Sequence, residues 1–226
     1  MSNSLNDRLS AYADIAADLS VDAVALVPGP NFTRAVDHAF MSHERPFVLV
    51  IPARGPAAAL VPNLELGSWE LVGFDGAVFD WRDQTGYDDA FAALMQHLNI
   101  TSLAVEGQVM RVFVHHALKK AQPDLRIIDA EREISAPRMI KTEAEVAALQ
   151  KAIDISERAL RATLDSVKLG QTEKEIEQKL VQMVFAEGAD DLSFAPIVAA
   201  GDGSARPHAK AREDYRVKAG DALLID

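Results

Sequence analysis

The chain of 226 residues contains no cysteine. This absence excludes disulfide bonds, zinc sites built from thiolates, and cysteine nucleophiles. No run of apolar residues is long enough to cross a bilayer, and the N-terminal segment has neither the basic start nor the apolar stretch of a signal peptide. We therefore expect a cytoplasmic protein with no membrane partner.

Basic residues are fewer than acidic residues. The chain has 23 Lys and Arg against 34 Asp and Glu, which gives a net charge of -11 at pH 7. Because phosphate binding requires a basic face, this balance predicts no nucleic-acid partner. The 49% of hydrophobic residues is enough for a sizeable core and argues against disorder.

Several catalytic and nucleotide-binding motifs are missing as well. The segment GDGSAR, residues 201–206, begins like a dinucleotide fingerprint but lacks its third glycine and opens no predicted helix. There is no Gly-x-x-x-x-Gly-Lys-Ser/Thr loop for a nucleoside triphosphate, and no Gly-x-Ser-x-Gly elbow for a serine nucleophile. The chemistry must be sought in other residues.

The first half of the chain alternates between strand and helix patterns. Apolar residues at helical spacing predict a helix over residues 5–19, and similar patterns predict helices over 87–98 and 109–121. Short apolar runs bounded by turn residues predict strands at 23–27, 47–51, 58–61, 71–74, 77–79, 102–105 and 125–128. This alternation indicates an α/β layer, a mixed sheet covered by helices.

The pattern changes near Pro137, where two long helices are predicted. Each begins with a capping box, Thr142 with Glu145 and Thr172 with Glu175, in which the Thr oxygen accepts from a free backbone N–H and the Glu reaches back. Two strands are expected to follow, at 193–199 and 222–225. We place the boundary near residues 130–137, which gives domains 1–133 and 134–226. An apolar stripe expected to be core consists of Val146, Leu149, Ile153, Leu160, Leu164 and Val167.

Four segments of the second half occur in an order that resembles a known family. They are RMIKTEAEVAALQKA (138–152), GQTEKEIEQKL (170–180), SFAPIVAAGDGSARPHA (193–209) and VKAGDALLID (217–226). The order resembles that of the Xaa-Pro peptidase, prolidase and creatinase family, and RPFVLVIPARGPAAALVPNLE (45–65) resembles its N-terminal domain. The resemblance implies a creatinase-like α/β N-terminal domain followed by the first half of an α+β pita-bread catalytic domain.

The resemblance also implies site residues. Catalytic members hold two divalent ions, Mn, Zn or Co, with two Asp, one His and two Glu, and Asp226 matches the first of these ligands. His208, in a Pro-His pair, matches a residue that hydrogen-bonds the substrate or the developing oxyanion. Phe194 matches an aromatic that lines the substrate pocket, with ordinary strand core as the other interpretation.

The other four ligands would lie beyond Asp226, so we expect the chain to be a fragment of a longer protein. A single carboxylate competes poorly with water for a transition metal, so we expect these residues alone to bind no metal and to be inactive. For the complete protein, the resemblance implies a homodimer that hydrolyses peptides with proline at the second position.

Two other functions stay open. One is a creatinase-like amidinohydrolase of the same family, and the other is a pseudoenzyme or binding module without a full ligand set. Residues 29–46 lack the Tyr-Leu-Thr-Gly stretch that many relatives carry there. Because this half can shape substrate choice, that departure bears on the substrate.

Overall fold

The structure, a computed structural model, describes residues 4–41 and 44–226 and divides into two compact units. Unit 1 comprises residues 1–141 and unit 2 comprises residues 142–226. The boundary predicted from the sequence, after residue 133, lies eight residues earlier than this division. Across the described ranges, no helix combines the length and the apolarity needed to cross a membrane.

Unit 1 is built on a six-stranded mixed sheet in the order β4-β3-β2-β1-β5-β6. Only β2 runs antiparallel to its neighbours, and the other neighbouring pairs are parallel. The mixed sheet expected from the sequence is therefore confirmed. The strands are β1 (Ala23–Leu26), β2 (Val48–Pro52), β3 (Ala58–Pro62), β4 (Ala77–Trp81), β5 (Ser102–Val105) and β6 (Arg126–Asp129).

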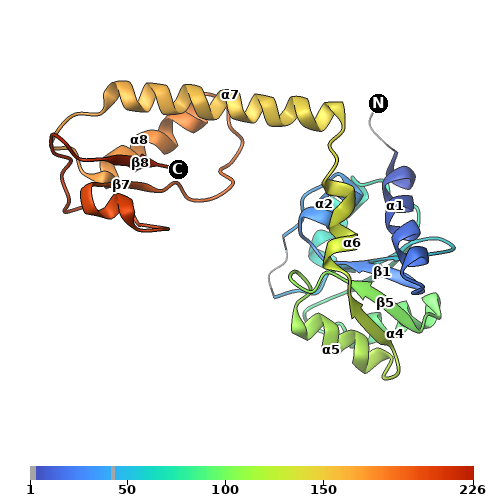
Figure 1. The fold of residues 1–226 in the computed structure, drawn as a ribbon. Helices are drawn as coiled ribbons and strands as arrows, with labels where there is room; N and C mark the ends of the chain where they lie inside the picture. The colour runs from blue at the N-terminus through green and yellow to red at the C-terminus, as the bar shows by residue number, and fades with distance from the viewer. Residues whose placement is uncertain (1–3, 42–43) are drawn as a thin grey trace. The chain divides into compact units, whose positions relative to one another are not determined.

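Helices cover both faces of this sheet (Figure 1). One face carries α1 (Leu5–Asp18), α2 (Pro30–Val36), α3 (Leu66–Glu70) and α6 (Glu131–Ser135). The other face carries α4 (Asp88–Leu98) and α5 (Val112–Ala121). Short 3-10 turns, η1 (Asn63–Glu65) and η2 (Ala136–Arg138), complete the unit. Because both faces are covered, every residue of β1, β2, β3 and β5 is buried.

One predicted strand of unit 1 is wrong. Residues 71–74 do not pair with the sheet but form the turn that follows α3. The Leu71 side chain is 77% exposed, and the chain reverses at Gly73, whose φ of 68° suits glycine. A four-residue apolar run cannot by itself distinguish a strand from the end of a helix.

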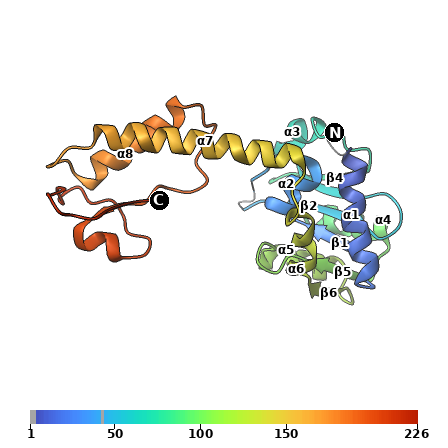
Figure 2. The same ribbon diagram turned by 45° about the horizontal axis from the view of Figure 1, so that its top comes forward.

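Unit 2 consists of two helices and a small antiparallel sheet. The helices α7 (Glu143–Ser166) and α8 (Glu173–Ala186) lie side by side in Figures 1 and 2. The sheet pairs β7 (Val198–Ala200) with β8 (Leu223–Ile225), and the 3-10 helix η3 (Gly201–Ala205) follows β7.

Both predicted capping boxes of unit 2 are confirmed. The Thr142 hydroxyl accepts from the Glu145 N–H at 3.2 Å, and the Thr172 hydroxyl accepts from the Glu175 N–H at 3.1 Å. The predicted strand over 193–199 is too long, because pairing begins only after Pro196, which has no N–H to donate.

The apolar stripe predicted as core on α7 is only partly core: Leu160 and Val167 are half-buried, and Val167 packs against the core of unit 2. The other members of the stripe are exposed. Val146, Leu149 and Ile153 are each about half exposed, and the helix buries Ile155 and Ala159 instead. Helical spacing shows that apolar residues share a face, but it does not show whether anything covers that face.

Candidate functional site

Asp226 is held by its backbone at the end of the β7–β8 ladder. Its N–H donates to the carbonyl oxygen of Ile197 at 2.9 Å, and its own carbonyl oxygen accepts from the Ile197 N–H at 2.7 Å. This doubly hydrogen-bonded pair continues the register Val198 to Ile225 by one more step. The position of Asp226 is therefore fixed by the sheet.

The Asp226 side chain lies on the open face of this sheet. Alternate residues Leu223 and Ile225 pack against the core formed by α8, including Ile176. Leu224 and Asp226 share the opposite face, because side chains alternate along a strand. Leu224 is 38% exposed and Asp226 is exposed, so the carboxylate is available to a ligand on this face.

His208 lies in a turn directly after η3. It follows Pro207, its side chain is exposed, and its φ is 55°, in the left-handed region. Histidine occupies this region more readily than most residues, yet such a backbone costs on the order of 1 kcal/mol or more. Its neighbours in the fold must therefore hold this loop in place.

Phe194 precedes β7 and belongs to no strand. Its side chain is 56% exposed, so the ring is not part of the strand core in unit 2. The structure thus puts Asp226, His208 and Phe194 in the same unit, on the two segments that flank β7 and at the end of β8.

The described residues do not by themselves fit a two-metal centre. Within the described ranges, no three His, Asp or Glu side chains lie close enough together to hold a metal ion. Asp226 offers one carboxylate, whereas divalent transition metals are held by clusters of carboxylate and imidazole ligands. Any such centre would need ligands outside this set.

Unit 2 also contains a largely buried ion pair that was not predicted from the sequence. Arg212 lies 2.7 Å from the fully buried carboxylate of Glu173. Burial tends to raise the pKa of Glu173, but hydrogen bonds from Arg212 and from the Ala200 N–H outweigh burial and lower it. Arg212 also lowers the pKa of Asp202. The partners are 39 residues apart in sequence, so no local spacing indicates the pair.

Unit 1 contains a second buried glutamate, also missed. Glu106 follows β5, and its Oε1 accepts from the amide of Asn31, itself buried, at 2.7 Å. Its Oε2 is buried and has no hydrogen-bond partner among the residues that the structure describes, and burial raises the pKa of this carboxyl. Arg138 donates to the other side of Asn31 at 2.6 Å. Through Asn31, this cluster links the start of α2 to Glu106 after β5 and to Arg138 in η2.

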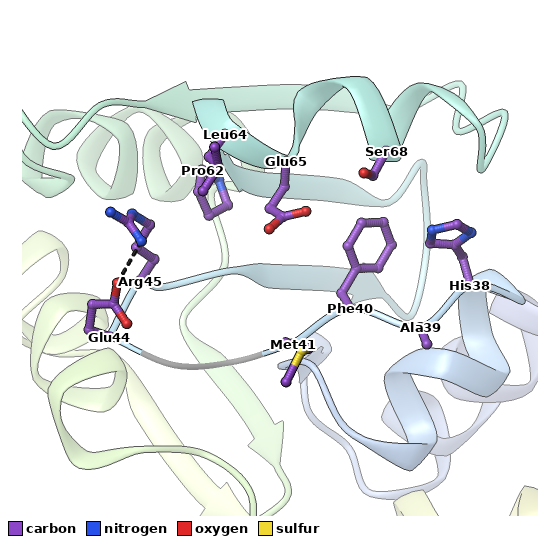
Figure 3. Close-up of a pocket in the computed structure, with 10 residues that line it drawn as sticks. All are labelled: His38, Ala39, Phe40, Met41, Glu44, Arg45, Pro62, Leu64, Glu65 and Ser68. Carbon is purple, nitrogen blue, oxygen red and sulfur yellow. Dashed lines mark hydrogen bonds and ion pairs between the residues drawn. The ribbon is translucent and has the colours of Figure 1, made fainter. Parts of the chain in front are cut away.

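A hollow of about 280 Å³ opens on unit 1 (Figure 3). It lies between the segment after α2, which supplies His38 and Phe40, and η1, which supplies Glu65. At one side Arg45 forms an ion pair with Glu44, the dashed contact in the figure. None of the three predicted site residues lines this hollow.

Comparison with known families identifies both parts of the chain. Residues 8–140, more than half of the chain, match the family model of the Creatinase/Prolidase N-terminal domain. The chain belongs to the creatinase/prolidase family. Residues 147–226 match the family model of Metallopeptidase family M24. The expected creatinase-like N-terminal domain followed by part of a pita-bread peptidase domain is confirmed.

Members of the creatinase/prolidase family match nearly the whole chain. A Xaa-Pro dipeptidase of Pyrococcus horikoshii is 27% identical over 229 residues, which is 98% of this chain and 60% of that protein. The crystal structure of a prolidase from Thermococcus sibiricus has a TM-score of 0.89 and 27% identity, covering 100% of this chain and 62% of the other. The dipeptidase PepE of Mycobacterium ulcerans has a TM-score of 0.85 and 26% identity, covering 99% and 60%. The chain thus spans about 60% of the length of these relatives.

Proposed function

We propose that these residues belong to a metal-dependent exopeptidase that hydrolyses Xaa-Pro peptide bonds. The observation that carries the proposal is the match to a Xaa-Pro dipeptidase, which runs through both units and covers 98% of the chain. Because the match covers only 60% of that relative, the activity is assigned to a longer protein that contains residues 1–226. Residues 1–226 alone are expected to be inactive.

Each predicted site residue has a role that its surroundings allow. The Asp226 carboxylate, fixed at the end of β8 on the open face, would supply one ligand to a pair of divalent ions, Mn, Zn or Co, whose other ligands lie outside the described residues. The exposed His208 imidazole donates a hydrogen bond to the substrate or to the oxyanion. The half-exposed Phe194 ring offers apolar surface to the substrate. When bound, the metal ions supply an activated water and polarise the peptide carbonyl.

Three further points belong to the same proposal. The protein is a homodimer, it acts in the cytoplasm, and its substrate is a peptide with proline at the second position. The net charge of -11 argues against nucleic acid as a partner.

A creatinase-like amidinohydrolase is the second candidate. It is favoured by the N-terminal match, whose description covers creatinases as well as prolidases. The two activities share a fold and differ in the bond that is cleaved, so only a substrate comparison separates them. A non-catalytic binding module is the outcome in which neither substrate is hydrolysed.

The test compares two proteins and three substrates. Residues 1–226 and the complete protein encoded by the gene are incubated with Mn²⁺, Co²⁺ or Zn²⁺ and with an Xaa-Pro dipeptide, the matching Xaa-Ala dipeptide, or creatine. We expect the complete protein to cleave only the Xaa-Pro dipeptide. Cleavage of creatine alone would instead establish the amidinohydrolase.

Substitution of Asp226 sharpens the assignment. Asp226→Asn should lower kcat/KM by more than roughly 100-fold, since loss of even an outer partner of a metal ligand costs about 10- to 100-fold. The matched control is Asp190→Asn, because Asp190 is also an exposed aspartate of unit 2. Equal activity of the two variants contradicts the ligand role of Asp226.

A further inference from the structure

Arg212 ties the loop that carries His208 to helix α8. It lies in the same loop, and its Nε and Nη2 donate to the two carboxylate oxygens of Glu173 at 2.9 and 2.7 Å. Its backbone N–H donates to Glu173 as well, at 2.8 Å. Glu173 is the first residue of α8, where the helix dipole favours a negative charge. Both the side chain and the backbone of Arg212 are therefore anchored to a fixed, buried carboxylate.

The remaining donors of Arg212 hold the other end of the same loop. Nη2 donates to the carbonyl oxygen of Ala200 at 2.9 Å, and Nη1 donates to Asp202 at 3.1 Å. Ala200 ends β7, and its N–H donates to Glu173 at 2.6 Å. One guanidinium thus joins the end of β7, the start of η3 and the start of α8, and His208 lies between its two points of attachment.

The strand β8, which leads directly to Asp226, is also connected to the Glu173–Arg212 pair. Gly201, which begins η3, donates its N–H to the Ala222 carbonyl at 3.0 Å, just before β8. The Arg212 guanidinium lies 4.0 Å from the centre of the Tyr215 ring, and the Tyr215 hydroxyl donates to Asp221 at 2.9 Å. The segment entering β8 is therefore fixed relative to the His208 loop.

The chain leaves room for the guanidinium at one glycine. A Cβ built on Gly203 would lie 2.7 Å from Arg212 Nη2, closer than real Cβ contacts. Any larger residue at this position would push the guanidinium away from its partners. Gly203 therefore allows the close approach of η3 to Arg212.

We propose that the Glu173–Arg212 pair is a positioning device, which sets the place of the His208 imidazole relative to the Asp226 carboxylate without itself touching the substrate. This inference rests on the function proposed above. Arg212 and Glu173 are positioning residues, and they act through the loop 206–211 and through the segment that enters β8. Loosening the pair leaves β7 and β8 paired but displaces the imidazole.

Lysine cannot replace Arg212 in this role. Here Arg212 uses three side-chain nitrogens, each aimed at a different acceptor, in the planar fork that matches a carboxylate. Lysine keeps the positive charge and loses the fork, so Arg212→Lys separates positioning from charge. Gly203→Ala disturbs the same contacts from the other side while keeping both charges.

The experiment uses the complete protein and two readouts. Arg212→Lys, Gly203→Ala and the control Arg158→Lys are compared by steady-state hydrolysis of an Xaa-Pro dipeptide and by hydrogen exchange of the amides of Ala200, Arg212 and the loop between them. Arg158 also donates to a glutamate in unit 2, Glu187 at 2.7 Å, but this pair is on the surface and away from the loop. Both assays are run well below the thermal midpoint of each variant.

We expect Arg212→Lys and Gly203→Ala to speed exchange at Ala200 and in the loop, and to lower kcat by about 10- to 100-fold with KM changed less than about threefold. A merely structural loss would lower the folded fraction and leave kcat per folded molecule unchanged. Faster exchange with an unchanged kcat overturns the positioning role. Unchanged exchange shows that the Glu173–Arg212 pair does not hold the loop. If the wild type cleaves no Xaa-Pro peptide, the proposed function fails and the positioning role fails with it. Hydrogen exchange then still shows whether the Glu173–Arg212 pair holds the loop.

Discussion

The two units of the chain differ in how completely they cover their own apolar surface. In unit 1, helices lie on both faces of the sheet, and the two resulting cores bury large side chains such as Phe32, Phe91 and Leu118. In unit 2, a two-stranded sheet has a helix on one face, and its core of buried residues is much smaller. Unit 1, which matches a Creatinase/Prolidase N-terminal domain, encloses its own core, whereas unit 2, which corresponds to part of a peptidase domain, leaves apolar surface open.

The uncovered surface of unit 2 is concentrated on two elements. The stripe of α7 exposes about half of each of Val146, Leu149 and Ile153, and the open face of β8 exposes Leu224 beside Asp226. A helix of this kind gains most of its stability from packing of its apolar face. Unit 2 therefore has less to hold it together than unit 1, although its helix ends are well capped.

The largest expected effect comes from separating the units. Residues 1–141 produced alone should unfold in a single cooperative transition in urea, because their cores are complete. Residues 142–226 alone should show no such transition, because a short chain with a small core is marginal at best. Circular dichroism during titration with urea measures both, and a cooperative transition in 142–226 would contradict the comparison.

A single core substitution in unit 1 should lower the free energy of unfolding far more than a comparable substitution in unit 2. Phe32 is fully buried and packs edge-to-face on Phe40 and Phe47, at centroid distances of 5.8 and 5.0 Å. Phe32→Ala should cost about 3–5 kcal/mol of unfolding free energy. Both tryptophans, Trp69 and Trp81, lie in unit 1, so tryptophan fluorescence of the 226-residue chain reports this unit alone.

The control for that substitution is a phenylalanine of unit 2. Phe185 is 45% exposed, so Phe185→Ala should leave the tryptophan transition in place. Equal shifts for the two variants would mean that the units unfold together. The stabilities of the two units could then not be separated by this measurement, and the comparison between them would fail.

Much of unit 1 could be predicted from the sequence because its signals are local. Apolar runs between turn residues predicted the strands, and β5 was placed with both of its bounds. The caps of α7 and α8 were predicted because a capping box spans only four residues. Where the apolar run was short, as at residues 71–74, the same reasoning failed.

What could not be predicted depends on contacts between distant residues. The exposure of Val146 and Leu149 depends on what covers α7, which helical spacing does not contain. The Glu173–Arg212 pair joins a helix start to a loop that only folding brings together. Asp226, His208 and Phe194 were chosen by resemblance, and their roles stay predictions.

The two buried glutamates, one in each unit, should respond to pH in opposite directions. The pKa of Glu173 is lowered, so its interactions stabilise the fold above its ordinary value of 4.5 and are lost as pH falls through the lowered pKa. Glu173→Gln should therefore destabilise unit 2 at pH 7, by roughly 1–3 kcal/mol for a charged hydrogen-bonding group, and much less in acid. Exchange of the Ala200 amide, which donates to Glu173, measures this loss.

For Glu106 the sign is reversed. Burial raises its pKa above 4.5, so the fold loses stability as the pH rises from 4.5 through the raised pKa, and the penalty is complete above that pKa and absent below 4.5. Glu106→Gln should thus become more stable relative to the wild type as pH rises from 4 to 8, with tryptophan fluorescence as the readout. The same pH trend in both variants would show that the two environments do not differ as described.

The smallest expected effect distinguishes the two capped helices of unit 2. The Thr142 and Thr172 caps have the same geometry, but Thr172 is buried whereas Thr142 is exposed at the start of the half-exposed stripe of α7. Thr172→Ala should cost about 1–2 kcal/mol, and Thr142→Ala about 0.5 kcal/mol, because caps of buried helix ends also hold tertiary contacts. Hydrogen exchange should show fraying confined to the first turn of α7 in Thr142→Ala, and loss of protection that reaches Ala200 in Thr172→Ala, since Glu173 follows the cap directly and accepts the Ala200 N–H. Equal and local fraying in both variants would mean that the start of α8 is no better anchored than the start of α7.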